Sequence, residues 1–235
     1  MTGLPLLLVA HGSRSDAADA VIRTLAEAVA ARGPQVEICY VDVRGPKVVD
    51  AVIGLQDRGH DGAVVVPAFL AAGYHVRTDL PAQLAEAGAD PARFAVTRSM
   101  GPDPLLAAAA LDRLRTAGYR DGDAVVLAAA GSSDPSAVAQ VHASAGMLAR
   151  RVGRPVPVGF AATGSPSVAE LVTRLHDAGE QRVAVASWLL APGVFQTRLL
   201  GSGADVVADP LGVHDDVVAA VLKRYAAGAA AVLAA

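Results

Sequence analysis

Cysteine is nearly absent from this sequence, and its scarcity limits the chemistry available to one chain. Cys39 is the single cysteine among 235 residues, so the chain cannot form an internal disulfide, and zinc or iron–sulfur sites built from several thiolates are excluded within it. Aromatic residues are also few, at 4% of the chain. We therefore expect a core of Ala, Val and Leu, as in parallel sheets covered by helices. No aromatic platform for stacking nucleic-acid bases is present.

Neither a charge of one sign nor a long apolar run dominates the chain. The 20 Lys and Arg residues stand against 23 Asp and Glu, and the resulting net charge of −3 provides no basic field for nucleic acid. No apolar run approaches the roughly 18 residues needed to span a bilayer. The apolar stretch at residues 4–10 follows no Lys or Arg and is too short for a signal-peptide core with a cleavage site. We therefore expect a cytoplasmic protein without a nucleic-acid or membrane partner.

Short aliphatic runs alternate along the chain with longer amphipathic stretches, and hydrophobic residues reach 53%, which is ample for a buried core. The aliphatic runs predict strands at residues 4–10, 36–43, 63–68 and 94–97. The amphipathic stretches predict helices at residues 16–32, 46–58, 78–87 and 105–117. Strands that alternate with helices of this length indicate right-handed βαβ units and a parallel sheet.

The same pattern starts again in the second half of the chain. Residues 131–132 repeat Gly12-Ser13 at an offset of 119. From Pro46 onward the offset is 120, and it relates Pro46 to Pro166, Val65 to Val185, Leu70 to Leu190 and Gly73 to Gly193. We interpret this as an internal duplication. The predicted fold is α/β, with two tandem flavodoxin-like lobes, each a four-stranded parallel sheet flanked by helices. We place the lobes at residues 1–119 and 120–235 and expect a monomer.

The two halves differ at their histidines. His11 follows the first predicted strand and His75 lies in the loop after the third, whereas the duplicate has Ala130 and Phe195 at these positions. In a flavodoxin-like strand order the first and third strands are neighbours, and the crevice at their carboxyl ends is the topological switch point. Imidazole binds Fe, Co, Ni or Zn and also accepts protons near neutral pH. We therefore predict one site per chain, although two unrelated polar histidines at strand ends would leave the same pattern.

A carboxylate follows the second predicted strand at Asp42. It can complete a His/His/carboxylate metal site with open positions, or it can simply cap the turn at the strand end. The remaining histidines have no ligand partner at helical spacing, and we expect them on the surface: His60, His142, His176 and His214.

Cations and free backbone N–H groups gather at the same predicted strand ends. Gly12 and Ser13 lead into a helix, whose N-terminus favours anions. Arginine can bind carboxylates in bidentate fashion, and four cations fall on this rim: Arg14, Arg44, Lys47 and Arg77. Ordinary solvated surface charge is the alternative for each of them. Ser13 lacks the Gly-x-Ser-x-Gly context of a nucleophile, which disfavours a hydrolase.

The runs around the two histidines resemble the class II chelatases of the sirohydrochlorin branch, the SirB/CbiX family. One run is Leu7-Leu8-Val9-Ala10-His11-Gly12-Ser13-Arg14. The other is Val66-Pro67-Ala68-Phe69-Leu70-Ala71-Ala72-Gly73-Tyr74-His75, followed by Asp79-Leu80-Pro81. The resemblance covers the whole chain, because long members of that family are tandem duplications with the histidine pair in the N-terminal half. It implies that His11 and His75 are the metal-binding and catalytic histidines, and that Asp42 stands where the family often has Glu.

The resemblance implies insertion of a divalent metal ion into a sirohydrochlorin-type tetrapyrrole with release of two protons, in sirohaem or cobalamin synthesis. The ion, Fe²⁺, Co²⁺ or Ni²⁺, is then a substrate, and no permanently bound cofactor is expected. A flat macrocycle with acidic side chains needs an apolar cleft between the lobes, lined by Phe69, Leu70, Trp188, Leu189 and Phe195. The other expected substrate contacts are Ser13, Arg14, Arg44, Lys47, Gly73 and Arg77.

Two other functions fit the same scaffold. A non-catalytic tetrapyrrole or metal carrier would bind without accelerating insertion, so turnover distinguishes it from an enzyme. A two-lobed binding protein of the periplasmic type is disfavoured by the missing export signal and by the asymmetry of the histidines.

Overall fold

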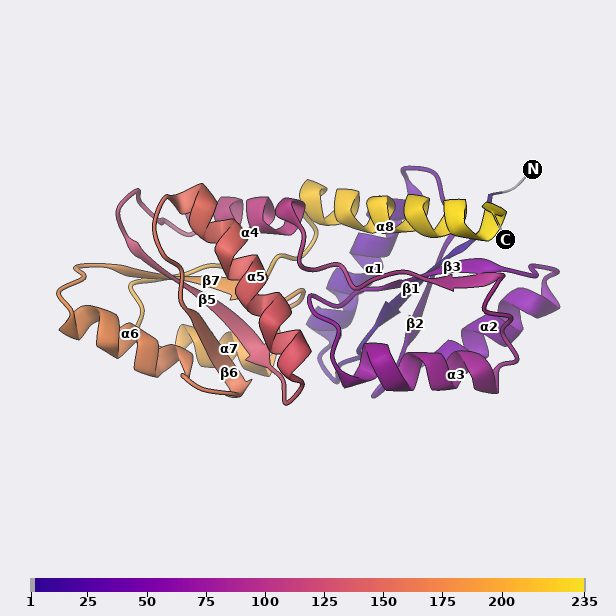
Figure 1. The fold of residues 1–235 in the computed structure, drawn as a ribbon, viewed down its shortest axis with the longest axis horizontal. Coiled ribbons are helices and arrows are strands. Elements are labelled where there is room, and N and C mark those ends of the chain that lie inside the picture. The colour runs from indigo at the N-terminus through magenta and orange to yellow at the C-terminus, as the bar shows by residue number, and fades with distance from the viewer. Residues whose placement is uncertain (1–2, 235) are drawn as a thin grey trace. The chain divides into compact units, whose positions relative to one another are not determined.

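Two parallel sheets organise the chain in the computed structural model, which describes residues 3–234 (Figure 1). The chain forms two compact units. One combines the residues up to Met100 with those from Val218 onward, and the other runs from Gly101 to Val217. The division predicted at 119/120 follows the sequence repeat. In the structure, the last helix of the first repeat belongs to the second unit, and most of the last helix of the second repeat belongs to the first unit.

The first unit holds the sheet β2-β1-β3-β4, all of it parallel. Its strands are β1 (Leu6–Ala10), β2 (Val36–Tyr40), β3 (Ala63–Pro67) and β4 (Phe94–Val96). Its helical elements are α1 (Asp16–Ala30), α2 (Val48–Asp57), the π-helical turn η1 (His75–Asp79), α3 (Leu80–Glu86) and most of α8 (Asp215–Ala234). The strand order places β1 and β3 side by side, as predicted.

The second unit repeats this order in the parallel sheet β6-β5-β7-β8. Its strands are β5 (Ala124–Gly131), β6 (Val158–Thr163), β7 (Val183–Trp188) and β8 (Val206–Val207). Its helices are α4 (Pro104–Thr116), α5 (Pro135–Val152), α6 (Val168–Asp177) and α7 (Val194–Leu200). The predicted α/β fold with two four-stranded parallel sheets is confirmed.

Strand register shows that the sequence repeat is also a structural repeat. Leu8 pairs with Ile38 in the first sheet, and Leu127 pairs with Val158 in the second. These pairs are related by the offsets of 119 and 120 read from the sequence. The isolated bridge between Tyr40 and Lys47 recurs in the same way between Phe160 and Ser167. Residues at these offsets can therefore be compared directly between the two units.

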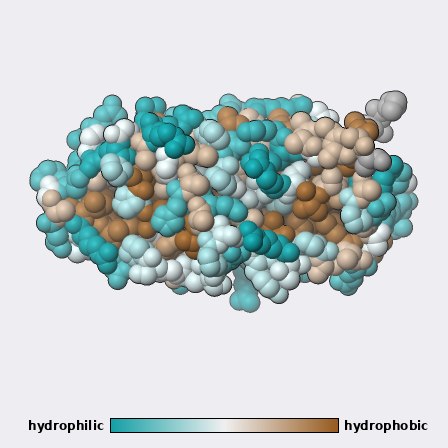
Figure 2. Space-filling model, in the orientation of Figure 1, coloured by the Kyte–Doolittle hydropathy of each residue, from teal (hydrophilic) through white to brown (hydrophobic). Residues whose placement is uncertain are grey.

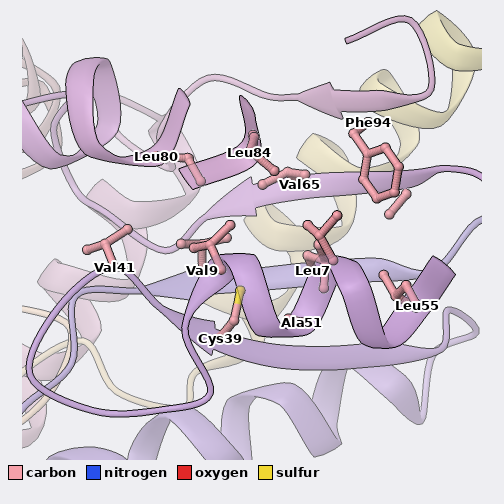
Figure 3. Close-up of a cluster of buried hydrophobic side chains, with 13 residues drawn as sticks. Leu7, Val9, Cys39, Val41, Ala51, Leu55, Val65, Leu80, Leu84 and Phe94 are labelled. Atoms are coloured by element: carbon pink, nitrogen blue, oxygen red, sulfur yellow. The ribbon is translucent and has the colours of Figure 1, made fainter. Parts of the chain in front are cut away.

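Both faces of the first sheet are buried, which explains why its strands are continuous apolar runs. On one face Val9 and Val65 pack with Leu55 of α2 (Figure 3). On the other face Val64 lies against α8, where a Cβ added at Gly228 would come within 2.5 Å of its Cγ1 atom. Only glycine allows α8 to approach this closely, so the helix is fitted to the sheet.

Cys39 belongs to the same buried cluster (Figure 3). Burial raises the pKa of its thiol to about 12. The side chain therefore remains a neutral thiol that fills the core, and it offers no thiolate to a metal ion.

Helix α8 is long and apolar enough, by length and composition, to cross a membrane. This differs from the expectation that no apolar stretch reaches that length. Figure 2 shows weakly hydrophobic residues over its C-terminal half. The helix also carries Arg224, which is 5% exposed and donates to the carbonyl oxygens of Ser99 and Met100. One such helix is weak support for a membrane span, because helices packed within a fold pass the same test.

Candidate functional site

The predicted approach of the two histidines is present in the first unit. His11 follows β1 directly and His75 begins the π-helical turn after β3. Because β1 and β3 are paired, with Val9 opposite Pro67, their carboxyl ends lie at one edge of the sheet. The Nε2 atoms of the two rings are 3.1 Å apart, and the rings meet edge to face with centroids separated by 4.4 Å.

The backbone on the His11 side is fixed by a close approach between two loops. The N–H of Asp42 donates to the His11 carbonyl oxygen at 3.0 Å. Gly12 has a φ of +95°, and a Cβ atom at this position would lie 2.2 Å from the Asp42 carbonyl oxygen. Only glycine fits both the backbone angle and the space. The loop sequence thus places His11 at the edge of the sheet by bringing two backbones together.

The backbone on the His75 side forms a π-helical turn from His75 to Asp79. The N–H of Leu80 donates to the His75 carbonyl oxygen, which closes the wider turn. Leu80 is fully buried in the core of the unit (Figure 3). Such turns are rare and occur frequently at functional sites. Asp79, at its end, places a carboxylate oxygen 2.5 Å from Nδ1 of His75.

The hydrogen-bond partners define which nitrogen of each ring carries a proton. His11 Nδ1 lies 3.0 Å from the Gly12 carbonyl oxygen, and His75 Nδ1 faces the Asp79 carboxylate. Both partners only accept, so each Nδ1 must be the donor. A neutral imidazole carries one N–H and leaves its other nitrogen as an acceptor. When both rings are neutral, the two Nε2 atoms therefore meet as two acceptors, and a proton or a cation beside them relieves their repulsion.

The separation of the two Nε2 atoms also suits one metal ion. Imidazole nitrogens bind metals such as zinc at about 2.0–2.1 Å. Two bonds of that length place the nitrogens about 2.9 Å apart at a right angle and about 3.3 Å apart at a tetrahedral angle. The observed 3.1 Å lies between these values. The separation of the pair is therefore compatible with two adjacent ligands of one ion.

Asp42 lies beside the histidines without joining them in a three-ligand group. Its Oδ1 accepts from the Val43 N–H at 2.7 Å and lies 4.0 Å from the Lys47 ammonium. The Val43 hydrogen bond is the main cause that lowers the pKa of Asp42, and the charge on Lys47 lowers it further. Within residues 3–234 no three His, Cys, Asp or Glu side chains are arranged to hold a metal. The structure thus brings together two of the three predicted ligands.

Among the predicted rim cations, Arg44 is already occupied within the protein. Its Nε donates to the Ser13 carbonyl oxygen at 2.5 Å, and its guanidinium pairs with Asp16 at 2.5 Å and Asp19 at 3.4 Å. It therefore braces the loop after His11 and is not poised to bind a substrate carboxylate. Arg77 donates to the Ala72 carbonyl oxygen at 3.1 Å but remains exposed, as does Arg14. Lys47 is partly exposed at the start of α2.

A buried polar network behind this loop was missed by the sequence analysis. Asp19 is 8% exposed and accepts hydrogen bonds from the Tyr40 hydroxyl and, at 2.7 Å, from Arg23 Nε. These two hydrogen bonds lower the pKa of Asp19, while burial and the bond to Asp19 raise the pKa of Tyr40 to about 12. The duplicate has Val138 and Phe160 at these two positions. Comparing polar residues between the two repeats would have found the network.

The apolar contacts predicted for a substrate have different surroundings. Phe69 is partly buried, with its ring centroid 6.3 Å from that of His11, and its neighbours Leu70 and Gly73 are also partly exposed. Trp188 is only 2% exposed within β7 and presents no surface to a ligand, because its side chain is buried in the second unit. Phe195 packs partly against the core of that unit, with the Arg198 guanidinium 5.8 Å from its ring centre. The prediction for Trp188 is therefore corrected.

Comparison with known proteins follows the two repeats. The family model CbiX matches residues 5–117 and again 124–227. Sirohydrochlorin cobaltochelatase of Sulfolobus acidocaldarius is 36% identical over 98 residues, which make up 42% of this chain and 79% of that protein. Two matches of one family model, one for each repeat, account for almost the whole chain.

Two solved structures share the complete fold. SirB from Bacillus subtilis with Fe³⁺ matches with a TM-score of 0.84 at 24% identity, over 97% of this chain and 96% of that one. CbiX, described as the terminal enzyme for biosynthesis of siroheme in denitrifying bacteria, matches with a TM-score of 0.66 at 26% identity, over 98% and 99% of the two chains. Both matches extend over the two sheets of this chain.

Proposed function

The chain belongs to the CbiX family, and on this premise we propose that it is a sirohydrochlorin chelatase that uses His11 and His75 to insert a divalent metal ion. The observation that carries the proposal is the pair of Nε2 atoms 3.1 Å apart, each on a ring whose Nδ1 lies beside an acceptor. Such a pair attracts electrophiles, and the reaction involves two kinds, a metal ion and protons. The proposed substrates are a sirohydrochlorin-type tetrapyrrole and Fe²⁺ or Co²⁺.

Charge balance favours an exchange of the ion for protons at this pair. The metal ion brings two positive charges to the site, and insertion releases two protons from the pyrrole nitrogens. An imidazole nitrogen cannot bind the ion and a proton at once, so each Nε2 becomes available as the ion passes to the macrocycle. The two protons can then leave through the pair one after the other, each accepted by an Nε2 atom and passed on to solvent, and imidazole is suited to such transfer.

The edge of the sheet offers groups for the acidic side chains of the macrocycle. Arg14, Lys47 and Arg77 remain at least partly exposed to solvent. The predicted anion site at the start of α1 is not among these groups, because Ser15 caps the helix and its first turn carries Asp16 and Asp19. We assign carboxylate binding to these groups, and we assign Phe69, Leu70 and Gly73 to contact with the apolar face of the ring.

An anaerobic insertion assay tests the proposal. Sirohydrochlorin is mixed with Fe²⁺, Co²⁺ or Ni²⁺ in parallel, with and without the protein, and insertion is followed by the change in the absorption spectrum. We expect many turnovers per chain with Fe²⁺ or Co²⁺. A protein that binds the ion and the macrocycle but leaves the insertion rate unchanged would be a carrier, and the proposal would be wrong.

A further inference from the structure

We infer that Asp79 is a positioning residue for this reaction, which fixes the proton of His75 on Nδ1 and so holds the bare Nε2 toward His11. The role of Asp79 in catalysis rests on the proposed function. The position of the proton on His75 does not, because it can be measured in the protein without substrate. The carboxylate oxygen lies 2.5 Å from Nδ1, well within hydrogen-bonding distance. A carboxylate that accepts from a ligating histidine orients the ring and fixes its tautomer.

The backbone around Asp79 makes this contact rigid. Asp79 ends the π-helical turn, and the next residue, Leu80, is fully buried and closes the turn onto the His75 carbonyl oxygen. The end of the turn is therefore anchored in the core by Leu80, and the Leu80 hydrogen bond connects it to the backbone of His75 at the start of the turn. The Asp79 and His75 side chains are partly exposed, at 29% and 34%, so the contact lies at the site and not in the core.

The second repeat shows that the fold itself does not need this carboxylate. At the offset of 120, Phe195 replaces His75 and Leu199 replaces Asp79. There α7 is an α-helix, and Leu199 is 1% exposed in an apolar core. The carboxylate and the π-helical turn thus occur in the repeat that has the histidine and are missing from the repeat that lacks it.

The tautomer matters because only one form of His75 can serve the pair. With the proton on Nδ1, the Nε2 lone pair faces His11 and can bind an ion. With the proton on Nε2, the lone pair faces Asp79, and an N–H group blocks the position of the ion. Loss of Asp79 should therefore weaken binding of the metal ion more than binding of the macrocycle.

Nuclear magnetic resonance of the metal-free protein tests the proton position directly. Protein labelled with ¹⁵N-histidine is studied at a pH where the rings are neutral, and His75 is assigned by comparison with H75A. We expect the Nδ1–H form in the wild type and in Asp79→Glu, and a substantial population of the Nε2–H form in Asp79→Asn. An Nε2–H form in the wild type, or unchanged spectra in Asp79→Asn, would overturn the inference.

Co²⁺ titration and steady-state kinetics supply the functional readout. Changes to groups that orient a metal ligand typically cost about 10- to 100-fold in metal affinity or activity. We expect Asp79→Asn to weaken Co²⁺ binding and to raise the KM for metal by about that factor, while the KM for sirohydrochlorin stays unchanged. In Asp79→Glu, which keeps a carboxylate, Co²⁺ affinity and the KM for metal should be close to the wild-type values. Glu86→Gln, an exposed carboxylate variant on α3, is the matched control. Equal loss in Glu86→Gln, or Co²⁺ affinity unchanged in Asp79→Asn, would refute the role of Asp79.

The two proposals can fail separately. If the wild type inserts no metal, the proposed function is wrong, while the proton position and Co²⁺ affinity still decide the role of Asp79. If the wild type is active and Asp79→Asn matches it in spectra and in metal KM, only the inference about Asp79 is wrong.

Discussion

At the scale of single residues, the proposed function depends on which nitrogen of each imidazole carries the proton. His11 and His75 both point Nδ1 at an acceptor and leave Nε2 for the shared site. Neither ring is needed to hold the fold together, because Ala130 and Phe195 occupy the corresponding positions of the second repeat. Chemistry and stability can therefore be separated by substitution.

Replacement of either histidine by alanine should remove most of the insertion activity and leave the fold intact. Loss of a group that transfers protons typically lowers the rate by about 10²–10⁴-fold, and loss of a ligand weakens metal capture as well. The measurements are the insertion rate and the thermal unfolding temperature of His11→Ala, His75→Ala and the exposed control His142→Ala. Near wild-type rates in well-folded His11→Ala or His75→Ala would contradict the mechanism.

Replacement of Asp42 should have a smaller effect, which falls on metal affinity more than on turnover. Its carboxylate is exposed and bonded to the Val43 N–H, so it attracts the ion without occupying a position between the rings. We expect Asp42→Ala to weaken Co²⁺ binding by less than about tenfold, equivalent to about 1.4 kcal/mol. Coincident titration curves for variant and parent would reduce Asp42 to a turn residue.

At the scale of elements, Arg44 connects the loop between β1 and α1 to the buried polar network around Asp19 and Tyr40. Arg44 grips the Ser13 carbonyl oxygen, and Asp19 orients Arg44 from the first turn of α1. The duplicate replaces all three with Val138, Phe160 and Gly164 and has no histidine at the end of β5. The network therefore accompanies the site, and the βα unit folds without it.

The contribution of this network to stability should depend on pH. Because hydrogen bonds lower the pKa of Asp19 in the folded protein, its contribution is complete above the unfolded pKa of about 3.9 and is lost as pH falls through the lower folded value. Tyr40→Phe should reduce the free energy of unfolding by about 1–3 kcal/mol at pH 7. The deficit should shrink below about pH 4.

Urea unfolding from pH 7 to 3 checks this prediction, with Tyr74→Phe as the control. Tyr74 is 64% exposed, and loss of its hydroxyl should change stability little. A constant deficit for Tyr40→Phe at every pH would show that its hydroxyl does not act through the Asp19 carboxylate.

At the scale of the whole molecule, the proposed function implies a division of roles between two copies of one sheet. The first unit carries the histidine pair, and the second keeps the architecture with an apolar residue at each histidine position. The last helix of each repeat packs in the other unit, so α4 belongs with the second sheet and α8 with the first. The first unit is complete only when the end of the chain has been added.

Metal binding should therefore be limited to one ion per chain. Calorimetric titration of the metal-free protein with Co²⁺ should saturate at a ratio of one, because Ala130 and Phe195 provide no ligand in the second unit. His11→Ala should abolish this saturating phase. Two equivalent ions per chain would contradict the division of roles.

Removal of the Arg224 guanidinium should destabilise the first unit. Arg224 is 5% exposed and donates to the Ser99 carbonyl oxygen at 3.0 Å and that of Met100 at 2.7 Å. Arg224→Met leaves these acceptors without their donor, which costs about 1–3 kcal/mol. Lys223→Met, at an exposed neighbour on α8, should change the free energy of unfolding by less than about 0.5 kcal/mol. Similar effects of the two substitutions would show that the buried contacts do not hold α8 in place.

Features that depend on local pattern could be predicted from the amino-acid sequence. Continuous aliphatic runs predicted the strands, because a parallel sheet buried on both faces must be apolar at every position. The repeat predicted two similar sheets, and the loss of both histidines in the second copy indicated one site. A flavodoxin-like strand order makes the first and third strands neighbours, so the approach of His11 and His75 was predictable before any distance was known.

Features that depend on contacts between distant segments could be recognised only in the tertiary structure. The tautomer of each histidine follows from acceptors placed within 3.0 Å of Nδ1, and Arg44 is occupied because Ser13 and Asp16 fold against it. Trp188 is buried inside its unit. This could not be predicted, because the sequence of a single strand does not show which of its positions are covered by a helix. The exchange of α4 and α8 is invisible in the repeat for the same physical reason. Sequence periodicity specifies which face of an element is apolar, whereas the partner that covers that face is chosen only when the whole chain packs.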